Sequence, residues 1–136
     1  MYSIAKSFSF CYGHRLLDDA SKCRHLHGHT GRATVVLTTR KLDDRGMVAH
    51  FDELKRTVGT WIEKEIDHTM LLFESDPMFE AMRRANEKVI ALPFHPTAEN
   101  LARMIFEKVR SFGFPVVRVE LWESETAKAS YEEGST

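Results

Sequence analysis

Apolar and polar residues alternate along the segments 3–14 and 27–40, which is the two-residue period of a β-strand. In the first segment Phe10, Tyr12 and His14 share one parity and therefore one face of the predicted strand. The second segment contains the run TVVLTT, whose β-branched residues also favour a strand. We expect the two strands to pair as antiparallel neighbours.

The spacing of apolar residues and the end signals predict three helices. Residues 51–66 carry apolar side chains every three or four positions, the pattern of an amphipathic helix. A short helix is predicted over residues 76–85, with Asp76 as its N-cap and a proline at the first helical position. The last helix starts after Thr97, a favourable N-cap, and stops near Gly113.

Two more strands complete the expected architecture. A short strand is predicted over residues 89–92, and an alternating one over 116–123. Strands that adjoin through turns favour an antiparallel sheet with helices on one face, which is an α+β architecture. The chain has no internal repeat, linker or low-complexity tract, so we expect a single domain over residues 1–136.

The charge and cysteine content exclude several classes of protein. Lys and Arg number 19 against 20 Asp and Glu, so there is no excess of positive charge for binding nucleic acid or a membrane surface. Two cysteines are too few for a disulfide scaffold, and no apolar stretch approaches the ~20 residues of a membrane span. The N-terminus has no secretory signal, so we expect a cytoplasmic protein with reduced thiols.

The segment KCRHLHGHT, residues 22–30, gathers one cysteine and three histidines. His27 and His29 lie on the apolar face at the start of the second strand, and His14 ends the same face of the first strand. If the strands pair antiparallel, the three imidazoles meet at one edge, because residues two apart on a strand are separated by only ~6.6 Å. Three histidines without a fourth protein ligand are typical of a catalytic zinc site that keeps one position open. A histidine pair that binds no metal is the alternative.

Cys23 precedes His27 by four residues, which is ~13 Å along a continuous strand and too far for a shared metal. It becomes a ligand only if the loop folds sharply back. Beside Lys22 and Arg24 it is otherwise suited to act as a general base or nucleophile, because neighbouring positive charge favours a thiolate. An inert small residue is the alternative. His25 is expected in the loop, where it faces solvent or phosphate.

Two acidic positions complete the candidate chemistry. In the pair Asp67-His68, directly after a predicted helix, the carboxylate can fix the tautomer of the imidazole and support a proton relay. An ordinary helix end is the alternative. Glu123 shares parity with Val119 and Leu121, so it ends a buried face and needs a partner. A substrate with two N–H donors would serve, unless the strand ends there and Glu123 is hydrated.

Six motifs in order carry a resemblance that spans Ser7 to Tyr131. They are FSFCYGH, C-x3-H-G-H, GMVxxF before an ELK helix start, DH, PTAEN, and WESETA followed by a tyrosine. Together they resemble the 6-pyruvoyl-tetrahydropterin synthase family. The C-x3-H spacing is similar to its bacterial branch, the 6-carboxy-5,6,7,8-tetrahydropterin synthases of queuosine biosynthesis, whereas the animal enzymes have a longer gap there.

The resemblance implies the tunnelling fold, a four-stranded antiparallel sheet with two main helices on one face. It implies that three subunits close a barrel and that two barrels stack into a homo-hexamer. It also implies a zinc-dependent lyase that converts 7,8-dihydroneopterin triphosphate to 6-carboxy-5,6,7,8-tetrahydropterin and releases acetaldehyde and triphosphate. The alternatives are the product of the pyruvoyl-type reaction, and a non-catalytic relative that binds zinc or a pterin.

The resemblance further implies a role for each candidate residue. The zinc ligands would be three histidines: His14, His27 and His29. Cys23 would be the general base, and the pair Asp67-His68 of a neighbouring subunit would be its relay partner. Glu123 would anchor the amino and ring N–H groups of the pterin, with Thr97 near the same pocket. Candidate contacts for the triphosphate are four basic residues: Arg15, Lys22, Arg24 and His25.

The chain departs from the family pattern at two places. His50 stands in GMVAHF where the family has an acid, so packing or polar support by that acid is not expected to carry over unchanged. The segment 69–95 is longer than in compact bacterial members, and DHTMLL replaces the usual DHxxLN. An extra helix in this segment would reshape the pocket or a subunit contact, and with it the substrate.

Overall fold

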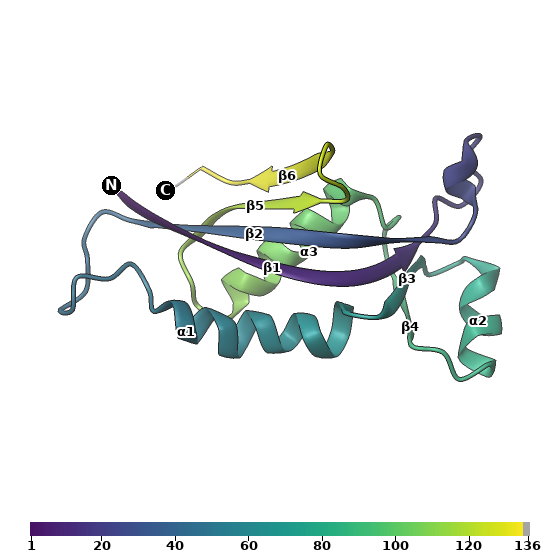
Figure 1. Ribbon diagram of the computed structural model, residues 1–136, viewed down its shortest axis with the longest axis horizontal. Coiled ribbons are helices and arrows are strands. Elements are labelled where there is room, and N and C mark those ends of the chain that lie inside the picture. The colour runs from purple at the N-terminus through teal and green to yellow at the C-terminus, as the bar shows by residue number, and fades with distance from the viewer. Residues whose placement is uncertain (135–136) are drawn as a thin grey trace.

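The computed structural model describes residues 1–134, so the last two positions of the predicted 1–136 domain lie outside the described residues. Its centre is a six-stranded sheet with the strand order β4-β3-β1-β2-β5-β6 (Figure 1). The strands are β1 (Tyr2–His14), β2 (His27–Thr39), β3 (Thr69–Phe73), β4 (Val89–Leu92), β5 (Val116–Trp122) and β6 (Lys128–Glu132). The two longest strands, β1 and β2, therefore occupy the middle of the sheet.

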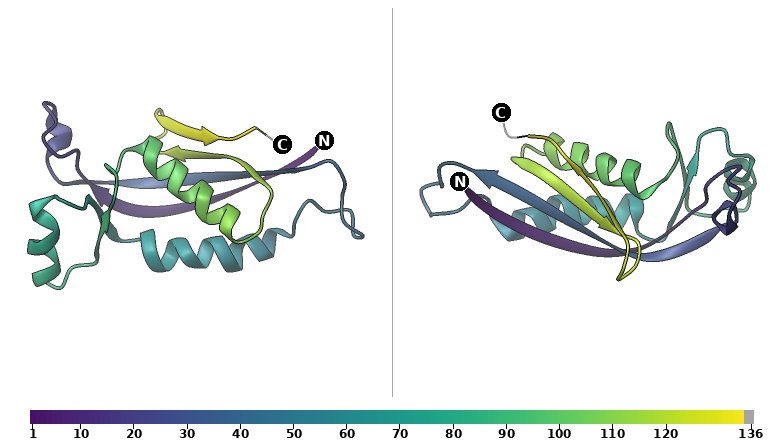
Figure 2. Two further views of the ribbon diagram at one scale, coloured as in Figure 1. Left: turned by 180° about the vertical axis from the view of Figure 1, so that it is seen from behind. Right: turned by 90° about the horizontal axis from the view of Figure 1, so that it is seen from above.

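Two long helices lie against one face of the sheet, as was expected, and the right-hand view of Figure 2 shows this arrangement. The first long helix begins as α1 (Phe51–Leu54) and continues through the π-type turns η2 (Lys55–Gly59) and η3 (Ile62–Ile66). The second long helix is α3 (Ala98–Ser111), and the shorter helix α2 (Pro77–Arg84) lies between the two along the chain. A 3-10 turn, η1 (Lys22–Arg24), lies in the connection between β1 and β2. No helix within residues 1–134 combines the length and apolar character that crossing a membrane requires.

The predicted antiparallel pairing of β1 with β2 is confirmed along the whole of both strands. Each has 13 residues, and the ladder runs from Tyr2 opposite Thr39 to His14 opposite His27. Residues of one parity turn toward the helices and are buried. The largest fully buried side chains include Leu37, Leu54, Ile66, Ile105, Phe106 and Leu121. The burial of each such side chain stabilises the fold by about 1.5–3 kcal/mol. The apolar residues of β1 therefore turn toward the core, and His14, which shares their parity, lies on the same face.

The expected four-stranded antiparallel sheet is wrong, because the sheet has six strands and is mixed. The strands β1, β2, β5 and β6 do pair antiparallel, but β3 and β4 extend the edge of β1 as parallel neighbours. The missed strand β3 has the sequence TMLLF, in which apolar and polar residues do not alternate. Its residues Met70 and Leu71 pair with Gly13 and His14, so β3 covers the edge of β1 at the histidine-bearing end.

The segment 69–95 contains the expected extra helix, α2, which connects the parallel strands β3 and β4. As predicted, Asp76 is its N-cap, and the carboxylate accepts a hydrogen bond from the Met78 N–H at 2.8 Å. Arg15, which directly follows β1, donates to the same carboxylate at 2.7 and 2.5 Å. Burial acts to raise the pKa of Asp76, but these hydrogen bonds and the Arg15 charge outweigh it and leave the pKa below its ordinary value. The pair thus joins β1 to α2.

We expect Asp76→Ala to lower the free energy of unfolding by about 3 kcal/mol, because it leaves Arg15 unpaired and removes a helix cap. With a lowered pKa in the folded state, Asp76 stabilises the fold above its unfolded-state pKa of about 3.9 and loses this effect as the pH falls through the folded-state pKa. Urea unfolding should therefore show a large difference in stability between wild type and Asp76→Ala at neutral pH and a smaller difference at about pH 3. Asp76→Asn, which keeps the shape of the cap, is the matched control and should lose less. Equal stability of wild type and Asp76→Ala at neutral pH would contradict the expectation.

His50 has a structural place at the start of α1. Its Nδ1 accepts a hydrogen bond from the Asp52 N–H at 3.1 Å, and its backbone is extended, as at an N-cap. A carboxylate at this position would accept the same hydrogen bond. The histidine therefore fills the capping role that an acid would have here, and within residues 1–134 it is not part of the cluster of three histidines.

We expect His50→Asp to raise the free energy of unfolding by about 0.5–1 kcal/mol, because Asp is a favoured N-cap and its charge suits a helix N-terminus. His50→Ala should lower it by about 1 kcal/mol through loss of the cap. Thermal or urea unfolding of the three proteins measures both effects. If His50→Asp proved less stable than His50→Ala, the imidazole ring would matter for a reason other than capping.

Candidate metal centre

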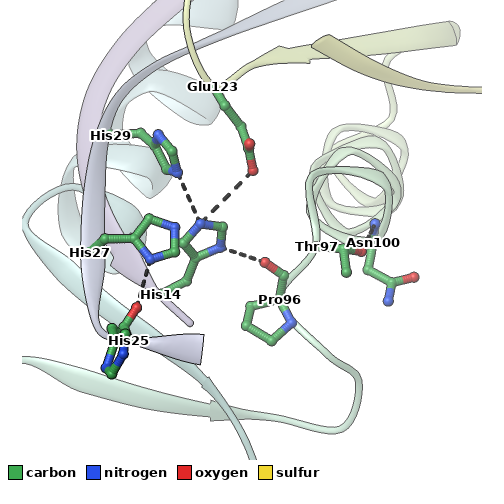
Figure 3. Close-up of polar contacts among 8 residues, drawn as sticks. All are labelled: His14, His25, His27, His29, Pro96, Thr97, Asn100 and Glu123. Carbon is green, nitrogen blue, oxygen red and sulfur yellow. Dashed lines mark hydrogen bonds and ion pairs between the residues drawn. The ribbon is translucent and has the colours of Figure 1, made fainter. Parts of the chain in front are cut away.

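Three imidazoles meet at one end of the β1–β2 ladder (Figure 3). His14 is the last residue of β1, and His27 and His29 are the first and third residues of β2. His14 is opposite His27, and His29 is opposite Tyr12 on the same face. One ring nitrogen from each histidine can be chosen so that all three lie within 4.8 Å of one another. The sequence-predicted convergence of these three side chains is therefore present in the structure.

Hydrogen bonds determine which nitrogen of two rings is free. Nδ1 of His14 lies 2.7 Å from the Pro96 carbonyl oxygen, and Nδ1 of His27 lies 2.7 Å from the His25 carbonyl oxygen. A carbonyl oxygen only accepts, so each Nδ1 carries the proton and each Nε2 keeps its lone pair. The Nε2 atoms of His14 and His29 are 3.0 Å apart, so they need a proton or a cation between them. Three such nitrogens suit a divalent transition metal.

His14 is the most enclosed member of the cluster, with 3% of its surface exposed, whereas the other two histidines are half-buried. Burial lowers the pKa of His14, and the opposing effects of the Pro96 carbonyl and the Glu123 charge do not reverse this. A neutral ring is the form that ligates a metal. The cluster therefore has one ligand anchored in the core and two at an accessible edge.

A carboxylate faces the three histidines from the neighbouring strand. Glu123 directly follows β5, and its Oε1 lies 3.9 Å from Nε2 of His14. Figure 3 shows the side chain turned toward the imidazoles. It is 28% exposed, so a ligand can reach it. The chain turns toward β6 here, with a hydrogen bond from the Glu123 N–H to the Ala127 carbonyl. The carboxylate thus lies where a buried strand face opens to solvent.

Thr97 lies beside the cluster, but its hydroxyl serves the helix α3. The oxygen accepts a hydrogen bond from the Asn100 N–H at 3.2 Å, which is the N-cap predicted from the sequence. The preceding residue, Pro96, gives its carbonyl to His14. In Figure 3 Thr97 and Asn100 lie on the far side of Pro96 from the imidazoles. The helix start is therefore attached to the cluster through its backbone.

Cys23 lies in the turn η1 and is half-buried. Within residues 1–134, the group of ligand atoms that lie within 4.8 Å of one another comes from the three histidines and does not include the Cys23 thiol. The turn is held by a hydrogen bond from the Leu16 N–H to the Cys23 carbonyl at 2.9 Å and by one from the Cys23 N–H to the Ser21 hydroxyl at 3.1 Å. The loop returns to the end of β1 without placing the thiol among the three nitrogens.

The pair Asp67-His68 is attached to the backbone of β1 at Cys11. One carboxylate oxygen lies 3.0 Å from Nδ1 of His68, and the other accepts the Cys11 N–H at 2.9 Å. The Cys11 N–H lowers the pKa of Asp67 despite an opposing effect of burial, and His68 lowers it further. The His68 N–H in turn donates to the Cys11 carbonyl. The backbone of His68 has a φ of 57°, which is uncommon for a residue other than glycine.

Within residues 1–134, the imidazole of His68 is not part of the group formed by His14, His27 and His29. It is 77% exposed and lines a cavity of about 510 Å³ together with Cys11 and Thr30, and residues His27 and His29 border the same cavity. Cys11 and Thr30 have the parity opposite to that of His14 and His29, so their side chains lie on the other face of the sheet. The side chains of this predicted site pair interact with each other and with the backbone of Cys11, and the pair reaches the histidine cluster of its own chain only across the shared cavity.

The four basic residues considered for a triphosphate have different surroundings. Arg15 is engaged by the buried Asp76 carboxylate. His25 contributes its carbonyl to His27, while its ring accepts from Arg24 at 3.3 Å. Lys22 and Arg24 are exposed in the turn η1. Only the loop members of this set are therefore free to meet an incoming anion.

Residues 3–134 match the sequence profile of the family described as 6-pyruvoyl tetrahydropterin synthase. The chain belongs to this family. The 6-carboxy-5,6,7,8-tetrahydropterin synthase of Haemophilus influenzae is 30% identical to it over 141 residues, which cover 98% of this chain and 100% of that protein. The protein of the same name from Aquifex aeolicus is 31% identical over 160 residues, covering 97% and 98%.

Solved structures agree with this membership of the 6-pyruvoyl tetrahydropterin synthase family. An uncharacterised protein from Wolinella succinogenes superposes with a TM-score of 0.84 at 28% identity and covers 98% of each chain. The 6-pyruvoyl tetrahydropterin synthase of Caenorhabditis elegans gives a TM-score of 0.72 at 24% identity, with 98% of this chain and 96% of that chain covered. The second likeness supports the fold alone.

Two kinds of group at this candidate site could not be found from the sequence. The carbonyls of Pro96 and His25 orient two histidines, and a main-chain oxygen leaves no signal in a residue pattern. The second kind is the ring of Tyr12, which the sequence pattern identifies only as part of an apolar strand face. Its ring packs against His14 and His29 at centroid distances of 5.3 and 5.5 Å. Burial, with the Glu123 charge, raises its pKa.

We expect His29→Ala to weaken the binding of Zn²⁺ by more than about a hundredfold, because loss of a ligand exceeds the 10–100-fold that loss of an orienting partner costs. Cys23→Ala should keep one bound ion per chain. His25→Ala is the matched control, since only its main-chain carbonyl contacts His27. Metal analysis and competition titration with a chelator measure all three. Loss of the ion from Cys23→Ala would identify the thiol as a ligand and refute the spacing argument.

Proposed function

We propose that this chain catalyses the zinc-dependent conversion of 7,8-dihydroneopterin triphosphate to 6-carboxy-5,6,7,8-tetrahydropterin, with release of acetaldehyde and triphosphate, as in queuosine biosynthesis. The observation that carries the proposal is the cluster of three imidazoles with the Glu123 carboxylate beside it. The names of the relatives from Haemophilus influenzae and Aquifex aeolicus support the product. The enzyme would be a lyase.

Zinc is the metal that we assign to the cluster. Three neutral imidazoles with an open fourth position form the donor set of catalytic zinc sites. The 3.0 Å between Nε2 of His14 and Nε2 of His29 is close to the ~3.3 Å expected for two nitrogens held tetrahedrally at ~2.0 Å. When bound, zinc would supply Lewis acidity that makes the side-chain hydroxyls of the substrate more acidic.

Glu123 is the residue that we assign to the pterin ring. One edge of a pterin carries an amino group beside a ring N–H, and an ionised carboxylate accepts a hydrogen bond from each. The carboxylate is 3.9 Å from His14 and partly exposed, so a ring bound to it would hold its side chain near the histidines. Thr97 would lie at the rim of the same pocket, with its hydroxyl kept by the helix cap.

Cys23 is the proposed general base. It lies in the turn η1 near the end of β1, outside the group of three nitrogens, and it is half-buried. A thiolate in this position would take a proton from the substrate side chain rather than hold the metal. The exposed Lys22 and Arg24 in the same turn would meet the triphosphate.

The pair Asp67-His68 is proposed to act in the site of a neighbouring subunit. Its imidazole is largely exposed and is not part of the three-histidine group of its own chain within residues 1–134, which leaves it accessible to a second copy. Carried by a second copy, the same imidazole would relay the proton from the thiol, with Asp67 fixing its tautomer. We therefore propose a homo-hexamer formed by two trimeric barrels, in which the sheet face free of helices lines each barrel.

Incubation of the zinc-loaded protein with 7,8-dihydroneopterin triphosphate tests the reaction, and mass spectrometry identifies the products. We expect 6-carboxy-5,6,7,8-tetrahydropterin and acetaldehyde in equal amounts. Cys23→Ala should lose turnover while it keeps its zinc, which separates loss of the base from loss of the metal.

Two outcomes would replace the proposal by an alternative. A diketo pterin without acetaldehyde would assign the pyruvoyl-type reaction, in which triphosphate leaves and an internal redox shift follows. Recovery of unchanged substrate from a zinc-loaded protein that binds it would assign a non-catalytic pterin-binding relative.

A further inference from the structure

Among residues 1–134, the hydroxyl of Tyr12, which is buried beside the candidate site, has no hydrogen-bond partner. The residue is 3% exposed, and its oxygen contacts no donor or acceptor within residues 1–134. A buried hydroxyl without a partner costs about 1–3 kcal/mol, and such groups are rare in folded proteins. A phenylalanine would fill the same space without this cost. The hydroxyl therefore needs an explanation that the ligand-free fold does not provide.

The ring of Tyr12 extends from β1 across β2. Its Cε1 would come within 2.8 Å of a Cβ atom at Gly31, so the ring occupies the space that this glycine leaves open. On the other side of Gly31 lies β5, where the ladder pairs Arg32 with Trp122. Continued by one residue, this register brings Gly31 beside Glu123. The ring thus points from β1 over Gly31 toward the strand end that carries the carboxylate.

We propose that Tyr12 is a positioning residue whose hydroxyl donates a hydrogen bond to the Glu123 carboxylate when a pterin is bound. This inference rests on the proposed function. A carboxylate has about four lone-pair sites, so it can accept two N–H groups from the ring edge and one O–H from Tyr12. In the ligand-free chain Glu123 instead lies 3.9 Å from Nε2 of His14. With its proton on Nδ1, His14 presents a lone pair at Nε2 and offers the carboxylate no hydrogen bond, so the Tyr12 hydroxyl is the donor on the same sheet face.

Tyr12→Phe tests the inference, because it removes one oxygen and keeps the ring. Pterin itself is the probe, since it has the hydrogen-bonding edge but no side chain for the metal. Its fluorescence titration should give a dissociation constant at least about tenfold higher for Tyr12→Phe, the loss expected for a hydrogen bond to a charged group. With the full substrate, KM should rise while kcat changes little. The metal content should stay the same.

The melting temperature measured without ligand gives a second readout with the opposite sign. Removal of an unsatisfied buried hydroxyl should leave it unchanged or raise it. A hydroxyl with a purely structural role would lower the melting temperature and leave pterin binding as it was. Tyr131→Phe is the matched control, because Tyr131 lies on β6 and its hydroxyl donates a hydrogen bond to the Glu133 carboxylate at 2.7 Å. This control should not change pterin binding.

A double-mutant cycle shows whether Tyr12 acts through Glu123. In a Glu123→Gln background, Tyr12→Phe should weaken pterin binding by much less than tenfold, because the charged acceptor is gone. Pterin binding that is equal in wild type and Tyr12→Phe, or additive effects in the cycle, would overturn the inference while the proposed function stands. Failure of the wild-type chain to bind pterin would refute both the proposed function and the inference.

Discussion

The antiparallel register between β1 and β2 is the constraint on which the candidate site depends. It places His14 opposite His27 and leaves His29 two residues further along the same face. A slip by one residue would turn the histidines of one strand to the other face of the sheet. The register is held by the buried parity of both strands, for which Val35 and Leu37 are fully enclosed examples. The packing of the core therefore also fixes the positions of the candidate ligands.

Main-chain oxygens give the cluster its chemical form. The carbonyls of Pro96 and His25 each hold an Nδ1 proton, which leaves two Nε2 lone pairs directed into one space. Pro96 is in turn fixed by the helix that Thr97 caps. The loop carbonyl of His25 is supported by the short turn that contains Cys23. The backbone of a loop and of a helix start thus determines which ring nitrogen His14 and His27 present.

Residue type and period were sufficient to predict some of this structure. Alternation located His14, His27 and His29 on one face, and the preferences of helix ends identified Asp76 and Thr97 as caps. Other features depend on contacts between distant segments. The strand β3 is too short and too evenly apolar to have a visible period, so its parallel pairing with β1 was missed.

The place of the pair Asp67-His68 was equally out of reach of the residue pattern. Proximity along the chain to the end of a helix does not indicate which face of a sheet a side chain will meet. Here the hydrogen bonds between this pair and the backbone of Cys11 fix the position of the pair, and Cys11 is 56 residues away from Asp67 along the chain. The orphan hydroxyl of Tyr12 is a similar case, because an aromatic residue on an apolar face gives no warning that its oxygen lacks a partner.

His14 is bound to the protein from several sides at once. It pairs with β2 and with β3, and its ring reaches a carbonyl 82 residues further along the chain. The two remaining histidines are half-buried members of β2 beside the β1–β2 connection, at the end of the ladder where local opening costs least. An ion held by this cluster would leave once these two ligands have come off, because a single imidazole does not retain it. Opening of this end of the β1–β2 ladder would therefore set the rate at which the ion exchanges. Lifetime of the bound ion, as distinct from its affinity, would then report on the cohesion of the sheet.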